Sequence, residues 1–335
     1  MCALLWCATV DAAEAAKPKA KPQAQDYGQR SDVRAFAAEV AAESGMSKRD
    51  VERWFAAARF QPRIVALMDR PLLEPPKWFA YAPPFLSQER IDGGVRFWRD
   101  NEAALARAEA TYGVPPQIIV AIIGVETFYG RYTGGYRVID ALATLAFDYP
   151  RRAQFFRGEL KEYVILARDQ GFSPLDPKGS FAGAMGVPQF MPGSYRRFAV
   201  DFDGDGHADL WRSNADVIGS VGHYLMRHDW QRGEPVLAPA TVSAEARDIA
   251  LRRLDGGISE RRPLAAWQLD GVTLRDATQE AGSDPVGILL LEEAGEGSAS
   301  LWIAYPNFYV ITRYNKSRLY AAAVWALSER IKNAR

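Results

Sequence analysis

An unbroken apolar run ends in a single glutamate, Glu126, in the first half of the chain. The run is Ile118–Val125; Pro115–Pro116 precede it, and Gly130 follows shortly after Glu126. Proline suits the first turn of a helix and glycine suits the position past its end, so the sequence predicts one helix between them. On a period of 3.6 residues, Glu126 lies on the face of Ile123 and of the isoleucines before it.

A carboxyl group on such a face is expected to point into the protein. Desolvation raises the pKa of a carboxyl group, which then holds a proton near neutral pH. A group of this kind can serve as a general acid. The structural alternative is a buried glutamate that pairs with an arginine or caps a neighbouring helix. Periodicity alone does not decide between the two.

The size and charge of the chain narrow the classes of protein to be considered. With 335 residues it exceeds the usual size of one domain, so two or more lobes are expected. Its 41 basic and 41 acidic residues give a formal net charge of zero. This balance offers no electrostatic case for nucleic acid or an anionic membrane surface as a partner. No run of 18 uncharged apolar residues is present, so no interior transmembrane helix is predicted.

Residues 1–28 are predicted to be the remnant of an export signal and a linker. Cys2 and Cys7 lie in an apolar start, and Val10–Ala12 suits a cleavage site. A basic n-region is missing, and Leu4–Cys7 is a poor lipoprotein box because a tryptophan precedes the cysteine. One cysteine or none would remain after processing, so no disulfide is expected. The Ala, Lys, Pro and Gln of residues 12–25 predict a flexible tether.

Helical periodicity dominates the chain up to about Trp230, interrupted by a proline-rich, loop-like stretch at residues 71–84. Beyond Trp230, short apolar segments between Gly, Asp and Ser predict strands, and the chain closes with a helix. The fold class is therefore mainly α, with a small β-containing insert. The expected helices are within 33–58, at 103–112, 155–167, 217–226 and 318–331; the expected strands are 272–274, 288–291 and 301–304, with 308–312 as a further strand or extended segment.

Several catalytic motifs are missing from the sequence. It contains no G-x-S-x-G, P-loop, G-x-G-x-x-G or H-E-x-x-H motif. Its histidines are His207, His223 and His228, which leaves little for a Ser–His–Asp hydrolase or a His-ligated zinc enzyme. His223 and His228 are five residues apart and do not share a helix face, so we interpret both as non-catalytic. Carboxylates, hydroxyls and amides remain as the candidate chemistry.

A second motif lies at residues 201–209, D-F-D-G-D-G-H-A-D. It matches the opening of a calcium loop, in which oxygens at positions 1, 3 and 5 and a backbone carbonyl at position 7 surround the ion. Position 12 is Arg212, a cation where a bidentate Glu is usual. The alternative is an Asp/Gly-rich surface turn without an ion. The expected ligands are Asp201, Asp203, Asp205 and the carbonyl of His207, completed by Asp209 or Asp216.

Polar side chains in Gly-rich or aromatic surroundings form a third group. Sugars offer hydroxyl edges and apolar ring faces, which amides, hydroxyls and aromatic rings bind. Singly, each of these residues has an ordinary explanation as part of a turn, the surface or the core. The members of the group are Ser180, Gln189, Tyr314, Asn315 and Tyr320.

Several long motifs follow one another along the chain in an order typical of one family. They are G-V-P-P at 113–116, G-V-E-T at 124–127, D-A-L-A-T-L at 140–145, Y-P-R-R at 149–152, G-S-F-A-G-A-M-G at 179–186, Q-F-M-P at 189–192 and N-F-Y-V-I-T-R-Y-N at 307–315. With these motifs the chain resembles the membrane-bound lytic murein transglycosylase B type, or family 3 lytic transglycosylases. The resemblance extends from about residue 33 to 330.

The resemblance implies cleavage of the β-1,4 bond between N-acetylmuramic acid and N-acetylglucosamine in peptidoglycan. The muramic C6 hydroxyl replaces water as the acceptor, which gives a 1,6-anhydro product. Glu126 corresponds to the single catalytic acid/base, and no cofactor takes part in catalysis. The implied fold is a lysozyme-like helical core with a calcium-loop insert, a flanking helical lobe and a small β-containing lobe.

Cleft residues of the family can be transferred where the motifs match. Ser180 and Gln189 resemble sugar-binding positions, and Tyr314, Asn315 and Tyr320 resemble cleft-wall residues. Tyr224, after Gly219–Val221, is a further candidate. In the family the R-Y-N motif, here at residues 313–315, usually continues with His. Lys316 occupies that position in this chain, and we assign it no role. The family's calcium loop closes with a late Asp, to which Asp216 corresponds one position further on.

These implications lead to a specific domain scheme and location. The expected parts are a signal and linker at 1–28, an N-terminal helical lobe at 29–110, a catalytic core at 111–232 with an EF-hand-like loop at 201–216, a β-containing lobe at 233–304 and a C-terminal segment at 305–335. The protein is expected in the periplasm, as a monomer bound to glycan strands, with an N-terminal lipid anchor as one option. The alternatives are a goose-lysozyme-type hydrolase and a non-catalytic peptidoglycan-binding protein.

Overall fold

The computed structural model describes residues 26–69, 76–275, 285–295 and 297–335. The predicted export signal, both cysteines and most of the linker lie outside these residues. The chain forms two compact units, each assembled from separate segments. Of the described residues, 76–129 and 214–335 (without 276–284 and 296) belong to unit 1, and 26–69 and 130–213 belong to unit 2.

Unit 2 is mostly helical, with a two-stranded antiparallel sheet of β1 and β2. Helix α9 packs against both α8 and α10, and α1 packs against α2. Its elements are η1 (Tyr27–Gln29), α1 (Ser31–Ser44), α2 (Lys48–Ala56), α3 (Pro62–Met68), β1 (Tyr136–Arg137), α8 (Val138–Phe147), η3 (Pro150–Arg152), α9 (Ala153–Asp169), β2 (Lys178–Gly179) and α10 (Pro192–Phe198).

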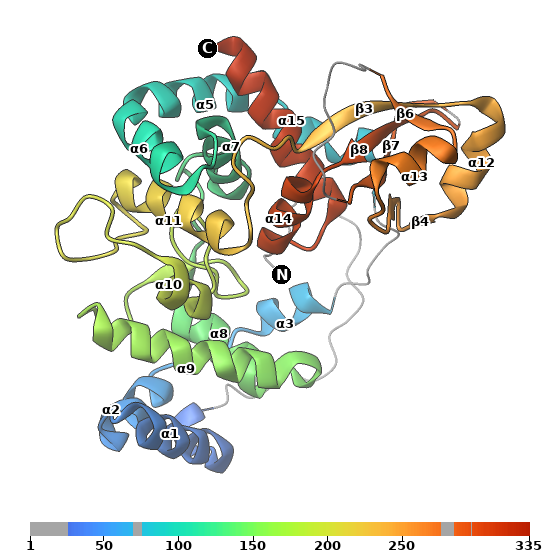
Figure 1. Cartoon of the computed structure of the whole chain (residues 1–335). Helices are drawn as coiled ribbons and strands as arrows, with labels where there is room; N and C mark the ends of the chain where they lie inside the picture. Colours follow the sequence, from blue (N-terminus) through green and yellow to red (C-terminus); the bar gives the residue numbers. More distant parts are fainter. Residues whose placement is uncertain (1–25, 70–75, 276–284, 296) are drawn as a thin grey trace. The chain divides into compact units, whose positions relative to one another are not determined.

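Unit 1 combines helices with a six-stranded sheet (Figure 1). Its helices are α4 (Trp78–Tyr81), η2 (Pro83–Phe85), α5 (Gln88–Asp100), α6 (Glu102–Tyr112), α7 (Pro116–Thr127), α11 (Asn214–Arg227), α12 (Ala244–Arg252), α13 (Leu264–Leu269), α14 (Pro306–Tyr314) and α15 (Arg318–Ala334). Its strands are β3 (Leu237–Val242), β4 (Leu254–Asp255), β5 (Ile258–Ser259), β6 (Val272–Leu274), β7 (Gly287–Glu292) and β8 (Ala299–Ala304).

Helix α7 is the centre of unit 1. Pro116 occupies its first turn, and the helix ends at Thr127, as the flanking residues predict. It is buried on every side, not along one stripe, because α5, α6, α11 and α15 pack around it. Each fully buried isoleucine, such as Ile122, contributes roughly 1.5–3 kcal/mol through removal from water. The periodicity therefore places Glu126 inside the protein, but every other face of the helix is buried too.

The close approach of α5 and α15 depends on a glycine. A Cβ atom added to Gly94 of α5 would lie 2.4 Å from the Cδ1 of Ile331 in α15 and 2.7 Å from the hydroxyl of Tyr129. Such distances do not occur between packed atoms, so the side chains of Ile331 and Tyr129 would have to shift to admit a larger residue. Glycine at this position lets these side chains pack directly against the backbone of α5.

The six-stranded sheet has the order β4-β5-β7-β8-β3-β6, and its neighbouring strands are antiparallel. Its core includes Trp267, Val272, Ile288 and Ile303, all fully buried. The indole N–H of Trp267 donates to the carbonyl of Val286 at 2.8 Å, so the large ring is buried without an unpaired donor. The sheet and helices α12 and α13 fall within residues 233–304, where the sequence predicts a small β-containing lobe.

Most predicted elements are confirmed, and one is wrong. The closing helix and the strands at residues 272–274, 288–291 and 301–304 appear as α15, β6, β7 and β8. Residues 308–312, expected as a strand or extended segment, instead lie in helix α14. Their aromatic and β-branched composition favours a strand, but Pro306 starts a helix, and Phe308 and Ile311, three residues apart, are both fully buried. Tertiary packing therefore overrides local preference here.

The two units do not follow the predicted domain scheme residue by residue. Residues 29–110 supply α1–α3 to unit 2 and α4–α6 to unit 1. The scheme stays a prediction about how the chain is organised. Among the described residues, no single helix has the length and apolar character to cross a membrane. Helices α6 and α7 together have that length and composition, but the pair is bent by 114°.

A buried carboxylate organises unit 2. Asp140, in the first turn of α8, is 4% exposed and receives two hydrogen bonds from the guanidinium of Arg137, at 2.7 and 2.9 Å. It also accepts a hydrogen bond from the backbone N–H of Arg59 at 2.9 Å. Close by, the backbone N–H of Gln61 donates to the hydroxyl of Thr144 at 3.0 Å. Two polar side chains of α8 thus fix the segment that joins α2 to α3.

We expect Asp140→Ala to lower the free energy of unfolding by about 3 kcal/mol, because the half-buried guanidinium of Arg137 loses its carboxylate partner and the backbone N–H of Arg59 loses its acceptor. Urea unfolding at constant ionic strength measures the change. As a control, Glu52→Ala removes the exposed Lys48–Glu52 ion pair and should cost no more than about 0.5 kcal/mol. Equal effects of the two changes would contradict the role given to Asp140.

Candidate active site

The chain leaves α7 through a strained turn directly after Glu126. Phe128 and Tyr129 have φ angles of 54° and 60°, and Gly130 follows with 87°. Consecutive left-handed residues with side chains are uncommon, and each costs of order 1 kcal/mol or more. Such strain clusters at functional sites, since the surrounding structure must hold it in place. The turn therefore marks the end of α7 as a candidate site.

Arg90 of α5 holds this turn. Its Nη1 donates to the carbonyl of Gly124, and its guanidinium lies 4.5 Å from the ring centroid of Phe128. The hydroxyl of Tyr129 donates back to the carbonyl of Arg90 at 2.7 Å. The arginine satisfies a carbonyl in the last turn of α7 and fixes the rings that follow Glu126.

Glu126 is 5% exposed, and its carboxylate accepts a hydrogen bond from the hydroxyl of Tyr320 at 2.6 Å. Burial raises the pKa of Glu126 from 4.5 to about 7, although the hydrogen bond from Tyr320 acts in the opposite direction. Among the described residues, no Arg or Lys forms an ion pair with it. The alternative that Glu126 is a structural glutamate paired with an arginine is therefore wrong. The site holds an acid that exchanges its proton near neutral pH.

Aromatic rings extend from Tyr320 along the same unit. The rings of Tyr320 and Tyr314 are stacked at 6.5 Å, and Tyr314 meets Tyr224 edge-on at 4.9 Å. The hydroxyl of Tyr224 donates to the carbonyl of Arg313 at 2.7 Å. Asn315, 7% exposed, ends α14 directly after Tyr314. Four residues predicted from the sequence thus form one continuous group with Glu126 in unit 1.

Tyr81 belongs to this site but was not predicted from the sequence. It ends the short helix α4, and burial raises its pKa, as does the charge of Glu126. Its ring lies 5.0 Å from that of Phe85. In the sequence Tyr81 lies in a stretch between prolines, which we interpreted as a loop. The aromatic sequence Trp78–Tyr81 is the signal that could have identified it.

Ser180 and Gln189 lie in unit 2, in the buried Gly-rich segment. Two backbone N–H groups, those of Ala182 and Ala184, donate to the Ser180 hydroxyl at 3.3 and 3.0 Å. Gln189 has a φ of 54°, and its amide donates to the carbonyls of Gly186 at 2.9 Å and Thr133 at 3.0 Å. Both side chains are held in one orientation, and the strained backbone of Gln189 resembles that after Glu126. Their roles stay predictions.

The predicted calcium loop forms a compact turn in unit 2. The Asp201 carboxylate accepts hydrogen bonds from the backbone N–H groups of Gly204, Asp205 and Gly206 at 2.7–3.1 Å. These bonds hold the pKa of Asp201 below its usual value. Carboxylate oxygens of Asp201 and Asp203 lie within 4.8 Å of each other, a spacing that one cation can bridge.

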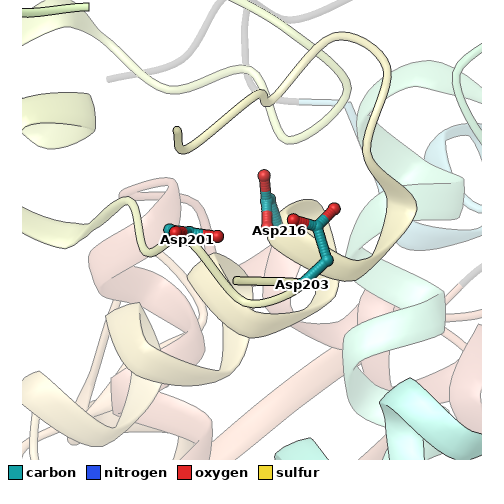
Figure 2. A group of neighbouring side chains, drawn as sticks. All are labelled: Asp201, Asp203 and Asp216. Atoms are coloured by element: carbon teal, nitrogen blue, oxygen red, sulfur yellow. The ribbon is translucent and has the colours of Figure 1, made fainter. Parts of the chain in front are cut away.

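The other expected ligands are distributed over both units. Asp205 accepts a hydrogen bond from the backbone N–H of His207 at 2.9 Å, and both residues are exposed. Asp216 is fully buried in the first turn of α11, in unit 1. Figure 2 shows Asp201 and Asp203 on the loop and Asp216 on its helix. Arg212, at the position where a Glu is usual, is exposed. The loop offers the hard oxygen donors that calcium prefers, so its composition fits the ion.

The fold and the buried acid define a class of protein. Comparison of the chain with known families identifies that class. Residues 28–329 match the model of the transglycosylase SLT domain family. The match includes almost all described residues, and the chain belongs to this family. The lysozyme-like α+β fold expected from the sequence is that of its solved relatives.

Individual relatives are similar over nearly their whole length. The chain is 40% identical to the membrane-bound lytic murein transglycosylase B of Escherichia coli over 319 residues, 92% of this chain and 85% of that protein. The lytic transglycosylase SltB1 of Pseudomonas aeruginosa has a TM-score of 0.84 at 43% identity, covering 92% of this chain and 99% of that one. Escherichia coli Slt35 in complex with calcium has a TM-score of 0.82 at 39% identity, covering 92% and 95%.

The raised pKa of Glu126 predicts an unusual dependence of stability on pH. Burial favours the protonated form in the folded protein, so this contribution is fully present below the unfolded pKa of 4.5 and is lost as the pH rises through about 7. Glu126→Gln, which cannot ionise, should therefore become the more stable protein above pH 7, by about 3 kcal/mol. Urea unfolding of both proteins between pH 4 and 8 tests this. A free-energy difference that does not change with pH would contradict it.

Proposed function

We propose that this protein is a lytic transglycosylase that cleaves the β-1,4 bond between N-acetylmuramic acid and N-acetylglucosamine and leaves 1,6-anhydromuramic ends. The observation that supports this best is the isolation of Glu126. It is a buried acid with a pKa of about 7, and no second carboxyl group of the described residues contributes to that pKa. Most glycosidases that use water employ a pair of carboxyl groups. A single acid suffices when the substrate supplies the nucleophile.

In the first step, protonated Glu126 gives its proton to the glycosidic oxygen while the bond from that oxygen to muramic C1 breaks. N-acetylglucosamine departs as an alcohol, and positive charge develops at C1, where the muramic acetamido oxygen can stabilise it. In the second step the C6 hydroxyl oxygen bonds to C1, and its proton passes to the Glu126 carboxylate. The acid is regenerated and no water is consumed. No step requires a metal or an organic cofactor.

Tyr320 has a part in both steps. Its hydrogen bond stabilises the carboxylate, which limits the rise of the pKa caused by burial. The acid is thus able to release its proton and to take one back near neutral pH, as general acid–base catalysis requires. The rings of Tyr314 and Tyr224 offer faces for sugar rings, and the amide of Asn315 offers hydrogen bonds to hydroxyls. We assign Ser180 and Gln189 to sugar binding by their motifs alone.

The relatives support a location for this activity. The Escherichia coli relative is a membrane-bound murein transglycosylase, which implies action in the cell envelope. We propose that the present protein acts on glycan strands in the periplasm, as a monomer. Attachment through a lipid on an N-terminal cysteine is a separate proposal, which concerns residues outside those described.

We also propose a structural calcium ion on the loop at residues 201–216. Asp201, Asp203, Asp205 and the carbonyl of His207 would hold it, with Asp216 as the late acidic ligand by its place in the sequence. The related Slt35 forms a complex with calcium. The ion would neutralise the carboxylates of the loop and stabilise its fold.

Glu126→Gln should abolish lysis of purified sacculi while the protein stays folded and still binds them. Loss of a general acid is expected to lower the rate by about 10²–10⁴-fold. Turbidity of sacculi measures lysis, and co-sedimentation measures binding. Glu159→Gln is a matched control, because burial also raises the pKa of that carboxyl group in unit 2. Activity that survives in Glu126→Gln would refute the role of the acid.

Mass spectrometry of the muropeptides distinguishes the transglycosylase from its closest rival. An anhydro end is lighter than a reducing end by one water. Reducing ends in the products of the wild-type protein would indicate a hydrolase of goose-lysozyme type. Binding without any product would indicate a non-catalytic peptidoglycan-binding protein.

Calcium should stabilise the folded protein, since an ion that binds only the native state at a hundred times its Kd contributes about 2.7 kcal/mol. We expect EDTA to lower Tm and added calcium to restore it. Asp203→Ala, which removes a ligand oxygen, should remove this response. His207→Ala should preserve it, because position 7 binds through its backbone carbonyl. A Tm that is the same with EDTA and with calcium would contradict the proposal.

A further inference from the structure

Glu292, at the end of β7, joins two helices of unit 1 that lie far apart in the sequence. Its Oε1 accepts a hydrogen bond from Nη2 of Arg318 at 2.8 Å, at the start of α15. Its Oε2 accepts one from the backbone N–H of Trp78 at 3.2 Å, at the start of α4. One carboxylate at the end of β7, an inner strand of the sheet, therefore fixes the first residue of each helix.

Arg318 occupies a site that is shaped around it. Its side chain is only 13% exposed, and its Nη1 donates to the carbonyl of Leu290 in β7 at 2.9 Å. Its Nε donates to the carbonyl of Gly256, in the turn between β4 and β5. A Cβ atom on Gly257 would lie 2.5 Å from the guanidinium, so that position requires glycine. The arginine thus uses all three nitrogens of its head group to bind the sheet.

Both helices that Glu292 fixes carry a tyrosine that interacts with Glu126, Tyr320 through a hydrogen bond and Tyr81 through the charge of the carboxylate. Tyr320 lies two residues after Arg318 in the first turn of α15, where the Ser317 hydroxyl accepts the hydrogen bond of the Tyr320 N–H at 3.3 Å. Tyr81 lies three residues after Trp78 at the end of α4, and the charge of Glu126 acts on it. A displacement of either first residue would therefore move a hydroxyl relative to the acid.

We propose that Glu292 and Arg318 are positioning residues for the reaction, and that the six-stranded sheet supports the acid through them. Neither residue forms a hydrogen bond or ion pair with Glu126, and the pair acts by holding the first residues of α15 and α4. The proposal rests on the proposed function of Glu126. It assigns a catalytic purpose to a sheet that lies outside the helical core.

The ionic character of the pair suits this task. Arg318 and hydrogen bonds from backbone N–H groups together hold the pKa of Glu292 below its usual value, against the effect of partial burial. Charge-assisted hydrogen bonds are shorter and more directional than neutral ones, and the forked guanidinium restricts rotation of α15 more than an ammonium group would.

The test is a set of conservative variants, Glu292→Gln, Arg318→Gln and Arg318→Lys, measured as kcat, KM and the pH profile on soluble muropeptide chains. We expect kcat to fall roughly ten- to a hundredfold with KM little changed, as small misplacements of a catalytic group do. The alkaline limb of the kcat profile should move to higher pH, because a weakened hydrogen bond from Tyr320 no longer lowers the pKa of Glu126. Arg318→Lys should recover part of kcat.

Two comparisons separate positioning from stability alone. Tyr320→Phe should shift the alkaline limb in the same direction. Arg262→Gln should leave it in place. Arg262 forms a similarly buried ion pair at 2.6 Å with Asp270, but this pair joins the two ends of α13 and involves neither α4 nor α15. If the variants of Glu292 and Arg318 lower Tm but keep the wild-type pH limb, as we expect for Arg262→Gln, the proposal is wrong.

A further readout does not depend on activity. Glu126→Gln is introduced into the wild-type protein and into each variant, and the resulting change in the free energy of unfolding is measured at several pH values. The pH dependence of this change gives the pKa of Glu126 in each protein. This pKa should rise in Glu292→Gln, which keeps the shape of the side chain and is expected to fold. An unchanged pKa would overturn the proposal even if Glu126 is confirmed as the acid. Activity that persists in Glu126→Gln would refute the proposed function instead.

Discussion

The desolvation of one carboxyl group is the constraint on which the rest of the active unit depends. Glu126 lies in the last turn of α7, where the negative end of the helix dipole also disfavours a carboxylate. Four helices remove water from α7, and they raise the pKa of its acid as they form the core. Folding and the raised pKa of Glu126 thus have the same origin. A change that loosens the packing of α5 or α15 also lowers this pKa and leaves less of the protonated acid near neutral pH.

The same arrangement carries a cost in stability. Near neutral pH the folded protein holds a partly ionised group away from water, and directly after it two residues with side chains adopt left-handed backbone angles. Arg90 offsets part of this cost by donating a hydrogen bond to the carbonyl of Gly124 and by lying over the ring of Phe128. The hydroxyl of Tyr129 in turn donates a hydrogen bond to the carbonyl of Arg90. Strain and desolvation in a few successive residues distinguish this part of α7 from the rest of a well-packed core.

Local features could be predicted from the sequence, whereas features that join distant segments could not. Proline, glycine and an apolar run define α7, and the spacing of aspartates defines the loop at residues 201–209, because both depend on neighbours in the chain. Helix α14 was mistaken for a strand, since packing overrides its β-branched residues. Tyr81 was missed because short helices between prolines leave no periodicity. The partnership of Glu292 with Arg318 leaves no trace in any local pattern.

A single carboxyl group that is both acid and base must donate a proton in one step and accept a proton in the next. Burial alone would favour the protonated form so strongly that the second proton transfer would slow, and exposure would favour the carboxylate and slow the first. One hydroxyl group, 194 residues away in the sequence, moderates the effect of burial by donating to the carboxylate. Since the strength of a hydrogen bond falls steeply with distance and angle, the placement of Tyr320 determines the balance. A sheet that holds the start of α15 is therefore as relevant to the chemistry as the helix that carries the acid.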